Sequence, residues 1–214
     1  MIVAIDGPAG SGKSTVARAL ARELGLPFLD TGAMYRAVTL AVLRLGLDTS
    51  DEAACTRIAG ELRLTFDDEG KILIDGEAGE PHIRSQEVDA AVSEVSAHAG
   101  VRRAIVPLQQ AAASERGAVA EGRDMGTVVF PDTPYKFFLH ATLAERARRR
   151  AAQSERPGEL EAVTQELERR DTLDSGRKEA PLARADDARV IETEGASVEQ
   201  VVARLLELVR GEQV

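Results

Sequence analysis

The chain opens with a short run of apolar residues that ends in a glycine-rich stretch. Residues 2–5 are apolar, and residues 7–10 read Gly-Pro-Ala-Gly. A continuous β-branched run of this length is typical of a buried parallel strand. Val16, Leu20 and Leu24 follow at intervals of four, which places them on one face of a helix, and Gly25 ends the pattern. The pattern therefore predicts a strand, a glycine loop and a helix in immediate succession.

The same alternation of strand and helix signals returns in the second half of the chain. Residues 118–120, 135–139 and 189–191 are short apolar runs, each leading towards a segment with helix-forming composition, such as 198–209. Strands that alternate with helices favour a parallel sheet with helices on both faces. We therefore expect an α/β fold with a parallel core sheet flanked by helices.

A different pattern occupies residues 62–76. Leu62, Leu64 and Phe66 alternate with polar residues, and the dipeptides at 69–70 and 75–76 are Glu-Gly and Asp-Gly. Alternation with a period of two and Asp-Gly turns are signals of β-hairpins. We expect a small antiparallel β insertion within about 62–84.

Composition limits the classes of protein that this chain can represent. Its 214 residues are 43% hydrophobic, which suits one main domain. The net charge of −9 argues against a nucleic-acid or anionic-membrane partner, because such binders carry a basic excess. The single cysteine, the absence of a secretory signal pattern and the lack of an apolar run of about 18 residues predict a soluble cytoplasmic protein.

The glycine-rich stretch carries the strongest chemical signal. Residues 7–14 match the pattern G-x-x-x-x-G-K-[ST]. Glycines let backbone N–H groups surround a phosphate, the lysine reaches the β- and γ-phosphates of ATP, and the hydroxyl after it binds Mg²⁺. A glycine-rich turn with a surface lysine is the plainer alternative, but the flanking strand and helix favour ATP binding. The predicted ATP-binding residues are Gly7, Pro8, Ala9, Gly10, Ser11, Gly12, Lys13, Ser14 and Thr15, with Ser14 as the Mg²⁺ ligand.

A helical stripe near the carboxyl-terminal end changes from apolar to charged. Leu160, Val163 and Leu167 share one helical face, and the same spacing leads to Arg170, Asp174 and Arg177. Charges on an inward face need partners, which a nucleotide phosphate and ribose could supply. An internal network of ion pairs is the alternative.

Six further segments resemble the bacterial cytidylate kinases, a branch of the nucleoside monophosphate kinases, and the resemblance covers nearly the whole chain. The segments are 30–36 (DTGAMYR), 83–88 (IRSQEV), the pair Ser93 and Arg102, 121–130 (EGRDMGTVVF), 145–150 (ERARRR) and 170–177 (RDTLDSGR). The resemblance implies a P-loop NTPase fold, a single nucleoside monophosphate kinase domain spanning 1–214, and a monomer. It also implies direct in-line transfer of a phosphoryl group from ATP to CMP or dCMP in pyrimidine nucleotide metabolism.

The resemblance also implies roles for individual residues. Lys13, Arg123, Arg149 and Arg170 would be catalytic, and Ser93, Arg102 and Asp124 would surround the cytosine. The full set of implied CMP-binding residues is Thr31, Tyr35, Arg36, Ser93, Arg102, Arg123, Asp124, Arg170, Asp174 and Arg177.

Glu121 departs from the resembled family, which usually has the shorter Asp at this point. An apolar strand that ends in a carboxylate is the arrangement that places an acid beside Mg²⁺, so we expect Glu121 to act on the metal through a water molecule or to assist as a base. An acidic strand end that is simply solvated is the alternative.

Local positive charge in an acidic chain suggests a lid over phosphates. Between 146 and 178 basic residues outnumber acidic ones by nine to seven, and Arg146, Arg149 and Arg150 share a helical face. The resemblance implies a lid at 146–169 with its tip at 153–158, a monophosphate-binding region at 31–99, and a core of 1–30, 100–145 and 170–214. A solvated surface helix is the alternative.

Two other functions fit the loop less well. An adenylate or shikimate kinase would share it, but the Gly-Gly-Gly run of shikimate kinases is absent. A guanine-nucleotide switch would need an Asn-Lys-x-Asp or Thr-Lys-x-Asp motif, which does not occur.

Overall fold

The computed structural model describes residues 1–67, 69–153 and 157–211, and these fall into two compact units. The first unit comprises Met1–Phe28 and Gly117–Val214, and the second comprises Leu29–Arg116. Each unit has its own cluster of buried apolar residues.

The first unit is built on a parallel sheet. Its strand order is β2-β6-β1-β7-β8, and the pairs β1–β6, β1–β7 and β7–β8 are all parallel. The strands are β1 (Ile2–Asp6), β2 (Phe28–Asp30), which crosses into the second unit, β6 (Ala118–Gly122), β7 (Tyr135–His140) and β8 (Arg189–Glu192). Because β1 is central, its carboxyl end and the loop that follows are surrounded by the ends of other strands.

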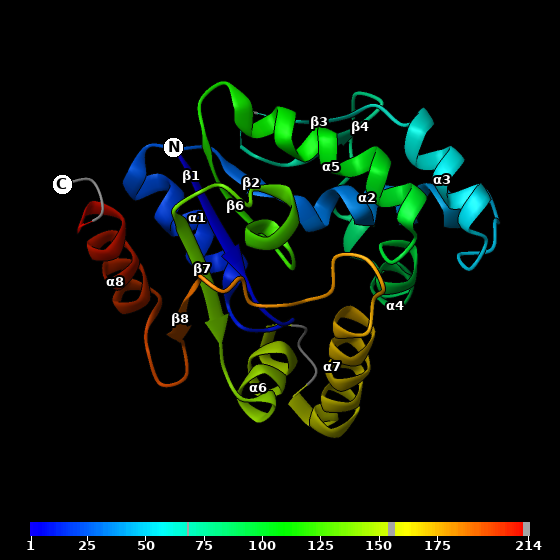
Figure 1. Cartoon of the computed structure of the whole chain (residues 1–214). Coiled ribbons are helices and arrows are strands. Elements are labelled where there is room, and N and C mark those ends of the chain that lie inside the picture. Colours follow the sequence, from blue (N-terminus) through cyan, green and yellow to red (C-terminus); the bar gives the residue numbers. More distant parts are fainter. Residues whose placement is uncertain (68, 154–156, 212–214) are drawn as a thin grey trace. The chain divides into compact units, whose positions relative to one another are not determined.

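The helices of the first unit follow these strands. They are α1 (Lys13–Leu24), α6 (Leu143–Gln153), α7 (Leu160–Ser175) and α8 (Val198–Gly211), with a π-helical turn at Met125–Val129 and a 3-10 turn at Pro157–Glu159. Helices α1 and α8 pack together against the sheet, and α6 and α7 lie side by side beyond the carboxyl ends of the strands (Figure 1).

Periodicity explains how α1 and α8 cover the sheet. Val16 and Leu20 of α1 meet Val201 and Leu205 of α8 and the apolar strand residues in one buried cluster. Leu20 and Leu205 are fully buried, and each such side chain contributes roughly 1.5–3 kcal/mol relative to exposure. The apolar face of α1, the helix that follows the glycine loop, is thus fixed by packing against α8 and the sheet.

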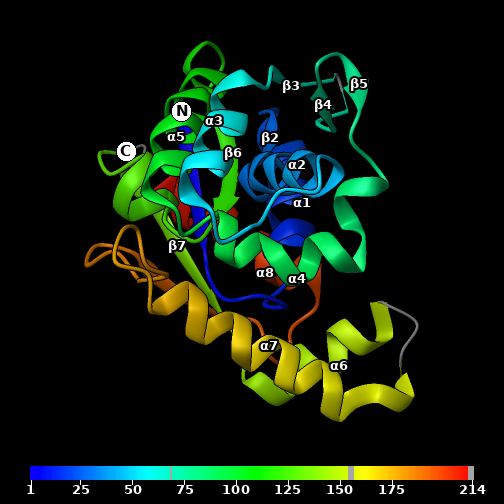
Figure 2. The same cartoon turned by 90° about the vertical axis from the view of Figure 1, so that its right-hand side faces the viewer.

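The second unit is mainly helical and carries the small antiparallel sheet (Figure 2). Its elements are α2 (Thr31–Arg44), α3 (Glu52–Glu61), β3 (Leu64–Phe66), β4 (Ile72–Ile74), β5 (Glu77–Ala78), a 3-10 turn at His82–Arg84, α4 (Gln86–Val95) and α5 (Ala99–Ser114). Asp30 caps α2 by accepting a hydrogen bond from the Ala33 N–H at 3.0 Å. Ser85 caps α4 in the same way.

The architecture confirms the predicted α/β class, the parallel core sheet and the antiparallel insertion. Two details of the sequence patterns were wrong. Leu160, assigned to the inward stripe, is 45% exposed because it is the first residue of α7, and Arg177 lies beyond the end of that helix at Ser175. Within the described ranges no helix is both long and apolar enough to cross a membrane. The division into core, monophosphate-binding region and lid stays a prediction.

Candidate active site

The loop between β1 and α1 is closely enclosed by the rest of the first unit. Gly7 has a φ of 149°, and a Cβ added there would lie 2.3 Å from the Leu139 carbonyl oxygen. Gly12, with a φ of 90°, precedes the first turn of α1. Both conformations favour glycine, and the loop leads to the amino end of a helix, where N–H groups lack partners within the helix. The structure therefore places the predicted phosphate loop at the amino end of α1.

Lys13 is buried beside this loop rather than extended into solvent. Its side chain is 5% exposed, and its Nζ donates to the Pro8 carbonyl oxygen at 2.7 Å. Burial lowers the pKa of Lys13 well below its ordinary value; the positive charges of Arg123 and Arg170 lower it further, and Glu121 opposes them. A buried ammonium among guanidinium groups is a site of positive potential that an anion would neutralise.

Two buried carboxylates lie near the carboxyl ends of the central strands. Glu121 is 5% exposed and is the penultimate residue of β6, so the strand continues one residue beyond the predicted end. Asp6, the last residue of β1, is also 5% exposed and accepts hydrogen bonds from the Met125 and Gly126 N–H groups. The sequence interpretation omitted Asp6, although the signal used for Glu121, a carboxylate at the end of an apolar strand, was present there too.

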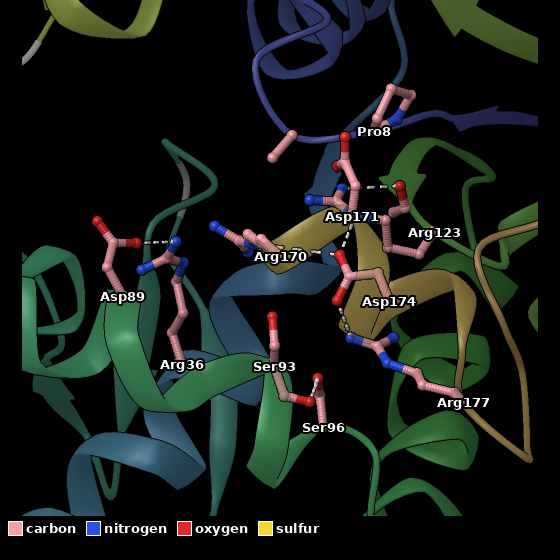
Figure 3. A network of polar contacts seen from close by, with 12 residues as sticks. Pro8, Arg36, Asp89, Ser93, Ser96, Arg123, Arg170, Asp171, Asp174 and Arg177 are labelled. Atoms are coloured by element: carbon pink, nitrogen blue, oxygen red, sulfur yellow. Dashed lines mark hydrogen bonds and ion pairs between the residues drawn. The ribbon is translucent and has the colours of Figure 1, made fainter. Parts of the chain in front are cut away.

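Asp174 lies at the centre of a cluster of three arginines. Its side chain is 1% exposed and accepts from Arg123 Nε at 2.8 Å and from Arg177 Nη2 at 2.5 Å, while Arg170 Nε lies 4.0 Å away (Figure 3). Burial alone would raise the pKa of Asp174, but the charges of Arg123, Arg177 and Arg170 outweigh it and hold that pKa below its ordinary value. The structure thus brings together the four residues that the sequence placed near a phosphate and a ribose.

The arginines of the predicted lid differ in their surroundings. Arg146 is buried and donates to the Ala9 carbonyl oxygen at 3.1 Å and to Asp171 at 2.7 Å, so it joins α6 to the phosphate loop and to α7. Arg149 is half-buried and donates to the hydroxyl and carbonyl oxygens of Thr193 at 3.0 and 2.6 Å. Arg150 is half-buried as well. Part of the predicted lid tip, 154–156, lies outside the described residues.

In the second unit, Arg36 is held by residues that the sequence did not assign. It is 7% exposed, and it donates to the Ile83 carbonyl oxygen at 3.1 Å and to Asp89 at 2.5 Å (Figure 3). Thr31, at the first position of the same helix, is 1% exposed. A guanidinium has five N–H donors, so these two bonds leave Arg36 able to bind a phosphate as well.

Ser93 and Arg102 approach each other in the second unit through Ser96. Both are 4% exposed; the Ser96 hydroxyl donates to the Ser93 carbonyl oxygen at 3.3 Å, and Arg102 donates to the Ser96 carbonyl oxygen at 3.3 Å. The Arg102 guanidinium also lies 5.3 Å from the centre of the Tyr35 ring, within cation–π range. Ser96 had no signal of its own in the sequence. Asp124, the remaining predicted base-binding residue, is 2% exposed in the first unit.

Comparison with known proteins places the whole chain in one family. The family model described as cytidylate kinase matches residues 3–211. The chain is 49% identical to a protein named cytidylate kinase from Mycobacterium avium, over 98% of this chain and 95% of that protein. It is 44% identical to one from Caldanaerobacter subterraneus, over 97% and 94%. A protein from a Synechococcus strain, named bifunctional pantoate ligase/cytidylate kinase, is 48% identical over 96% of this chain and 44% of that protein.

A solved structure supports the fold. The crystal structure of TT1252 from Thermus thermophilus aligns with a TM-score of 0.50 and 24% identity, over all of this chain and 98% of that one. At this identity the likeness concerns the fold alone. The match of the family model over nearly the whole length, together with relatives at 44–49% identity, carries the assignment. The chain belongs to the cytidylate kinase family.

Proposed function

We propose that the chain transfers the γ-phosphoryl group of ATP to the phosphate of CMP or dCMP, with Mg²⁺, by direct in-line displacement. The observation that supports this most strongly is the positive potential around Lys13. Burial, Arg123 and Arg170 lower the pKa of Lys13, and Glu121 and Asp6 offset them only in part, so a pair of nucleotide phosphates would stabilise the charged lysine. Membership of the family supports CMP as the acceptor.

On the donor side, the loop would hold ATP through backbone N–H groups of 7–15. Lys13 would leave the Pro8 carbonyl oxygen and contact the β- and γ-phosphates, where its charge matters most as the γ-phosphoryl group departs. Thr15 would add a hydroxyl on the α-phosphate side.

The residues present fit a magnesium ion held mainly by the nucleotide. Mg²⁺ takes oxygen ligands and often uses one or two protein groups with phosphates and waters. Ser14 is exposed at the start of α1, and Glu121 is a buried carboxylate that acts on the charge of Lys13. Among the described residues there is no cluster of three or more carboxylate, histidine or cysteine ligands. Most ligands of the ion would therefore be phosphate oxygens and waters. When bound, the ion would neutralise charge on the phosphate oxygens.

On the acceptor side, the guanidinium groups would hold the CMP phosphate and the transferring group. Arg123, which follows β6, contacts Asp174 at 2.8 Å, and Arg170 of α7 lies 4.0 Å from it. Asp174 would therefore orient both guanidinium groups before the nucleotide binds. Arg149 would stabilise the transferring charge from the lid. Arg36, Tyr35 and Thr31 would contribute from the second unit, and Asp174 and Arg177 would reach the sugar and phosphate. Catalysis would then consist of positioning and charge stabilisation, without a covalent enzyme intermediate.

Base choice would follow from hydrogen-bond polarity. Cytosine presents an amino donor beside a ring-nitrogen acceptor, whereas uracil presents an acceptor beside an N–H donor. The carboxylate of Asp124 can accept from the amino group, and Arg102 can donate to the acceptors of cytosine. Because all three predicted base-binding residues are buried, a wrongly polarised base would leave polar groups unpaired, which can cost up to roughly 10⁴-fold in kcat/KM.

The test is an ATP-dependent assay of diphosphate formation with a panel of nucleoside monophosphates. We expect CMP and dCMP to react far better than UMP, AMP or GMP. In Asp124→Asn the new amide can donate to uracil, so CMP activity should fall and the preference for CMP over UMP should narrow. An unchanged CMP to UMP ratio in a folded Asp124→Asn variant would show that Asp124 does not contact the base. A wild-type preference for another monophosphate would reject the proposed substrate.

The remaining expectations belong to the same proposal. We propose that the enzyme acts as a monomer in the cytoplasm and has no nucleic-acid or membrane partner. The acidic net charge supports the last point.

A further inference from the structure

Asp6 is a buried carboxylate that the proposed chemistry does not use. It is the last residue of β1 and directly precedes the phosphate loop. Its Oδ1 accepts from the Met125 N–H and its Oδ2 accepts from the Gly126 N–H, both at 2.8 Å. Each carboxylate oxygen therefore has its own backbone donor from a segment more than a hundred residues away in sequence.

Keeping a carboxylate at this position is costly. The pKa of Asp6 is raised to about 6, because the effect of burial, together with the nearby charge of Asp124, outweighs the two backbone hydrogen bonds and the charge of Lys13. The three residues before it in the strand, Val3, Ala4 and Ile5, are apolar and fully buried. An apolar residue at the strand end would avoid the desolvation of a carboxylate, so the hydrogen bonds of Asp6 need another explanation than the stability of β1.

The segment that Asp6 holds carries two residues of the proposed acceptor site. Arg123 and Asp124 follow directly after β6 ends at Gly122, where the pairing with β1 also ends. The π-helical turn that begins at Met125 is bonded within itself, since the N–H groups of Val128 and Val129 donate to the Asp124 carbonyl oxygen. Fixing the first N–H groups of this turn therefore fixes Asp124 as well.

The fit of the turn against Asp6 is close. A Cβ added at Gly126 would lie 3.2 Å from Lys136 Cδ and 3.4 Å from Asp6 Oδ2. A larger residue would require the Lys136 side chain or the turn to move by a few tenths of an ångström. Glycine therefore fits at this position without displacing either side chain.

We propose that Asp6 is a positioning residue for acceptor recognition: it anchors the Met125 and Gly126 N–H groups and thereby sets where Asp124 and Arg123 meet the monophosphate. This role rests on the proposed function, because it matters only if Asp124 and Arg123 bind the acceptor. It links the strand that leads into the ATP-binding loop to the segment that selects the base.

The principal test is Asp6→Asn, which keeps the shape of the side chain. An Asn amide can accept one of the two N–H groups, but its NH₂ group then faces the other donor, so one bond is lost and the turn shifts. We expect kcat/KM for CMP to fall about 10- to 100-fold, which is the scale of the loss caused by a small misplacement of a binding group. The ratio of kcat/KM for CMP to kcat/KM for UMP should fall as well. The Kd for ATP, measured by titration of the variant, should stay within about threefold of wild type.

Thr133→Val is the matched control. The Thr133 hydroxyl donates to the Ile2 carbonyl oxygen at 2.6 Å, at the opposite end of β1, so its loss weakens the same strand without touching the turn. This variant should lose stability and keep the CMP to UMP ratio of wild type. Gly126→Ala is a second, independent variant that shifts the turn while Asp6 stays in place, and it should narrow the ratio even if Asp6→Asn does not fold.

The outcomes separate this inference from the proposed function. A wild-type protein that does not phosphorylate CMP rejects the proposed function. A wild-type protein that does, with an unchanged CMP to UMP ratio in folded Asp6→Asn or in Gly126→Ala, rejects only the positioning role. Equal losses of ATP affinity and CMP activity in Asp6→Asn also reject it, because Asp6 would then act on the phosphate loop.

Discussion

The carboxylate of Asp174 should contribute more to stability than any surface ion pair of the first unit, and Asp174→Asn measures that contribution. The side chain is 1% exposed, and its partners Arg177 and Arg123 are 5% and 15% exposed. Removing one partner of a buried pair leaves charge without compensation and typically costs 3–5 kcal/mol. Since Arg123 and Arg170 retain some solvent contact, we expect the lower end of that range, about 3 kcal/mol.

Thermal unfolding followed by circular dichroism provides the measurement. For a chain of this size a loss of about 3 kcal/mol corresponds to a fall in Tm of roughly 6–12 °C. Glu207→Gln is the control, because Glu207 and Arg204 form an exposed pair at 3.3 Å with side chains 69% and 62% exposed. Exposed pairs are typically worth less than 1 kcal/mol, so this variant should unfold close to wild type.

The dependence on pH gives a second check of the same reasoning. The pKa of Asp174 is lower in the folded chain than in the unfolded chain, where it is near 4. Its stabilisation is therefore fully present above about pH 4 and is lost as the pH falls through the folded pKa. The difference in unfolding free energy between wild type and Asp174→Asn should be constant from pH 5 to 8 and shrink below pH 4. A loss under 1 kcal/mol at neutral pH would refute the view that Asp174 compensates the three arginines.

The remaining predictions concern the donor side. Lys13→Met keeps the length of the stem and removes the charge, so kcat should fall at least about 100-fold; a kcat within a few-fold of wild type would contradict the role of Lys13. Thr193→Val removes a hydroxyl that accepts from Arg149 and lies 3.1 Å from the Ser11 carbonyl oxygen, so the KM for ATP should rise several-fold while the KM for CMP stays unchanged. Thr193→Ser should restore the KM for ATP, and failure of that rescue would show that the hydroxyl is not responsible.

Local signals were sufficient to predict the donor loop and its helix. Gly7, Gly12 and Lys13 are close together in the sequence, and the positive φ angles of the two glycines are typical of that residue type. The hairpin of the second unit was predictable for the same reason, since alternating residues and Asp-Gly turns act over short distances. The spacing in α7 also led correctly to Asp174, which completes the inward face of that helix.

Partners distant in the chain could not be predicted. Arg36 pairs with Asp89, more than fifty residues away, and no feature of either segment indicates the other. The pairing of Asp6 with the Met125 and Gly126 N–H groups depends on the parallel register of β1 and β6. Sequence patterns predict that a charge is buried, but the sheet topology decides which group compensates it.

Arg146 restricts where the predicted lid can bend. Its guanidinium joins the Ala9 carbonyl oxygen and Asp171, and Gly10 lies so close that a Cβ there would be 3.1 Å from Arg146 Cβ. The first turns of α6 thus pack against the predicted phosphate loop. A rotation of α6 that began at residue 146 would break the hydrogen bond between Arg146 and the Ala9 carbonyl oxygen. If the predicted lid closes over a nucleotide, the motion must begin beyond this arginine, and the moving segment is then shorter than the basic segment predicted from the sequence.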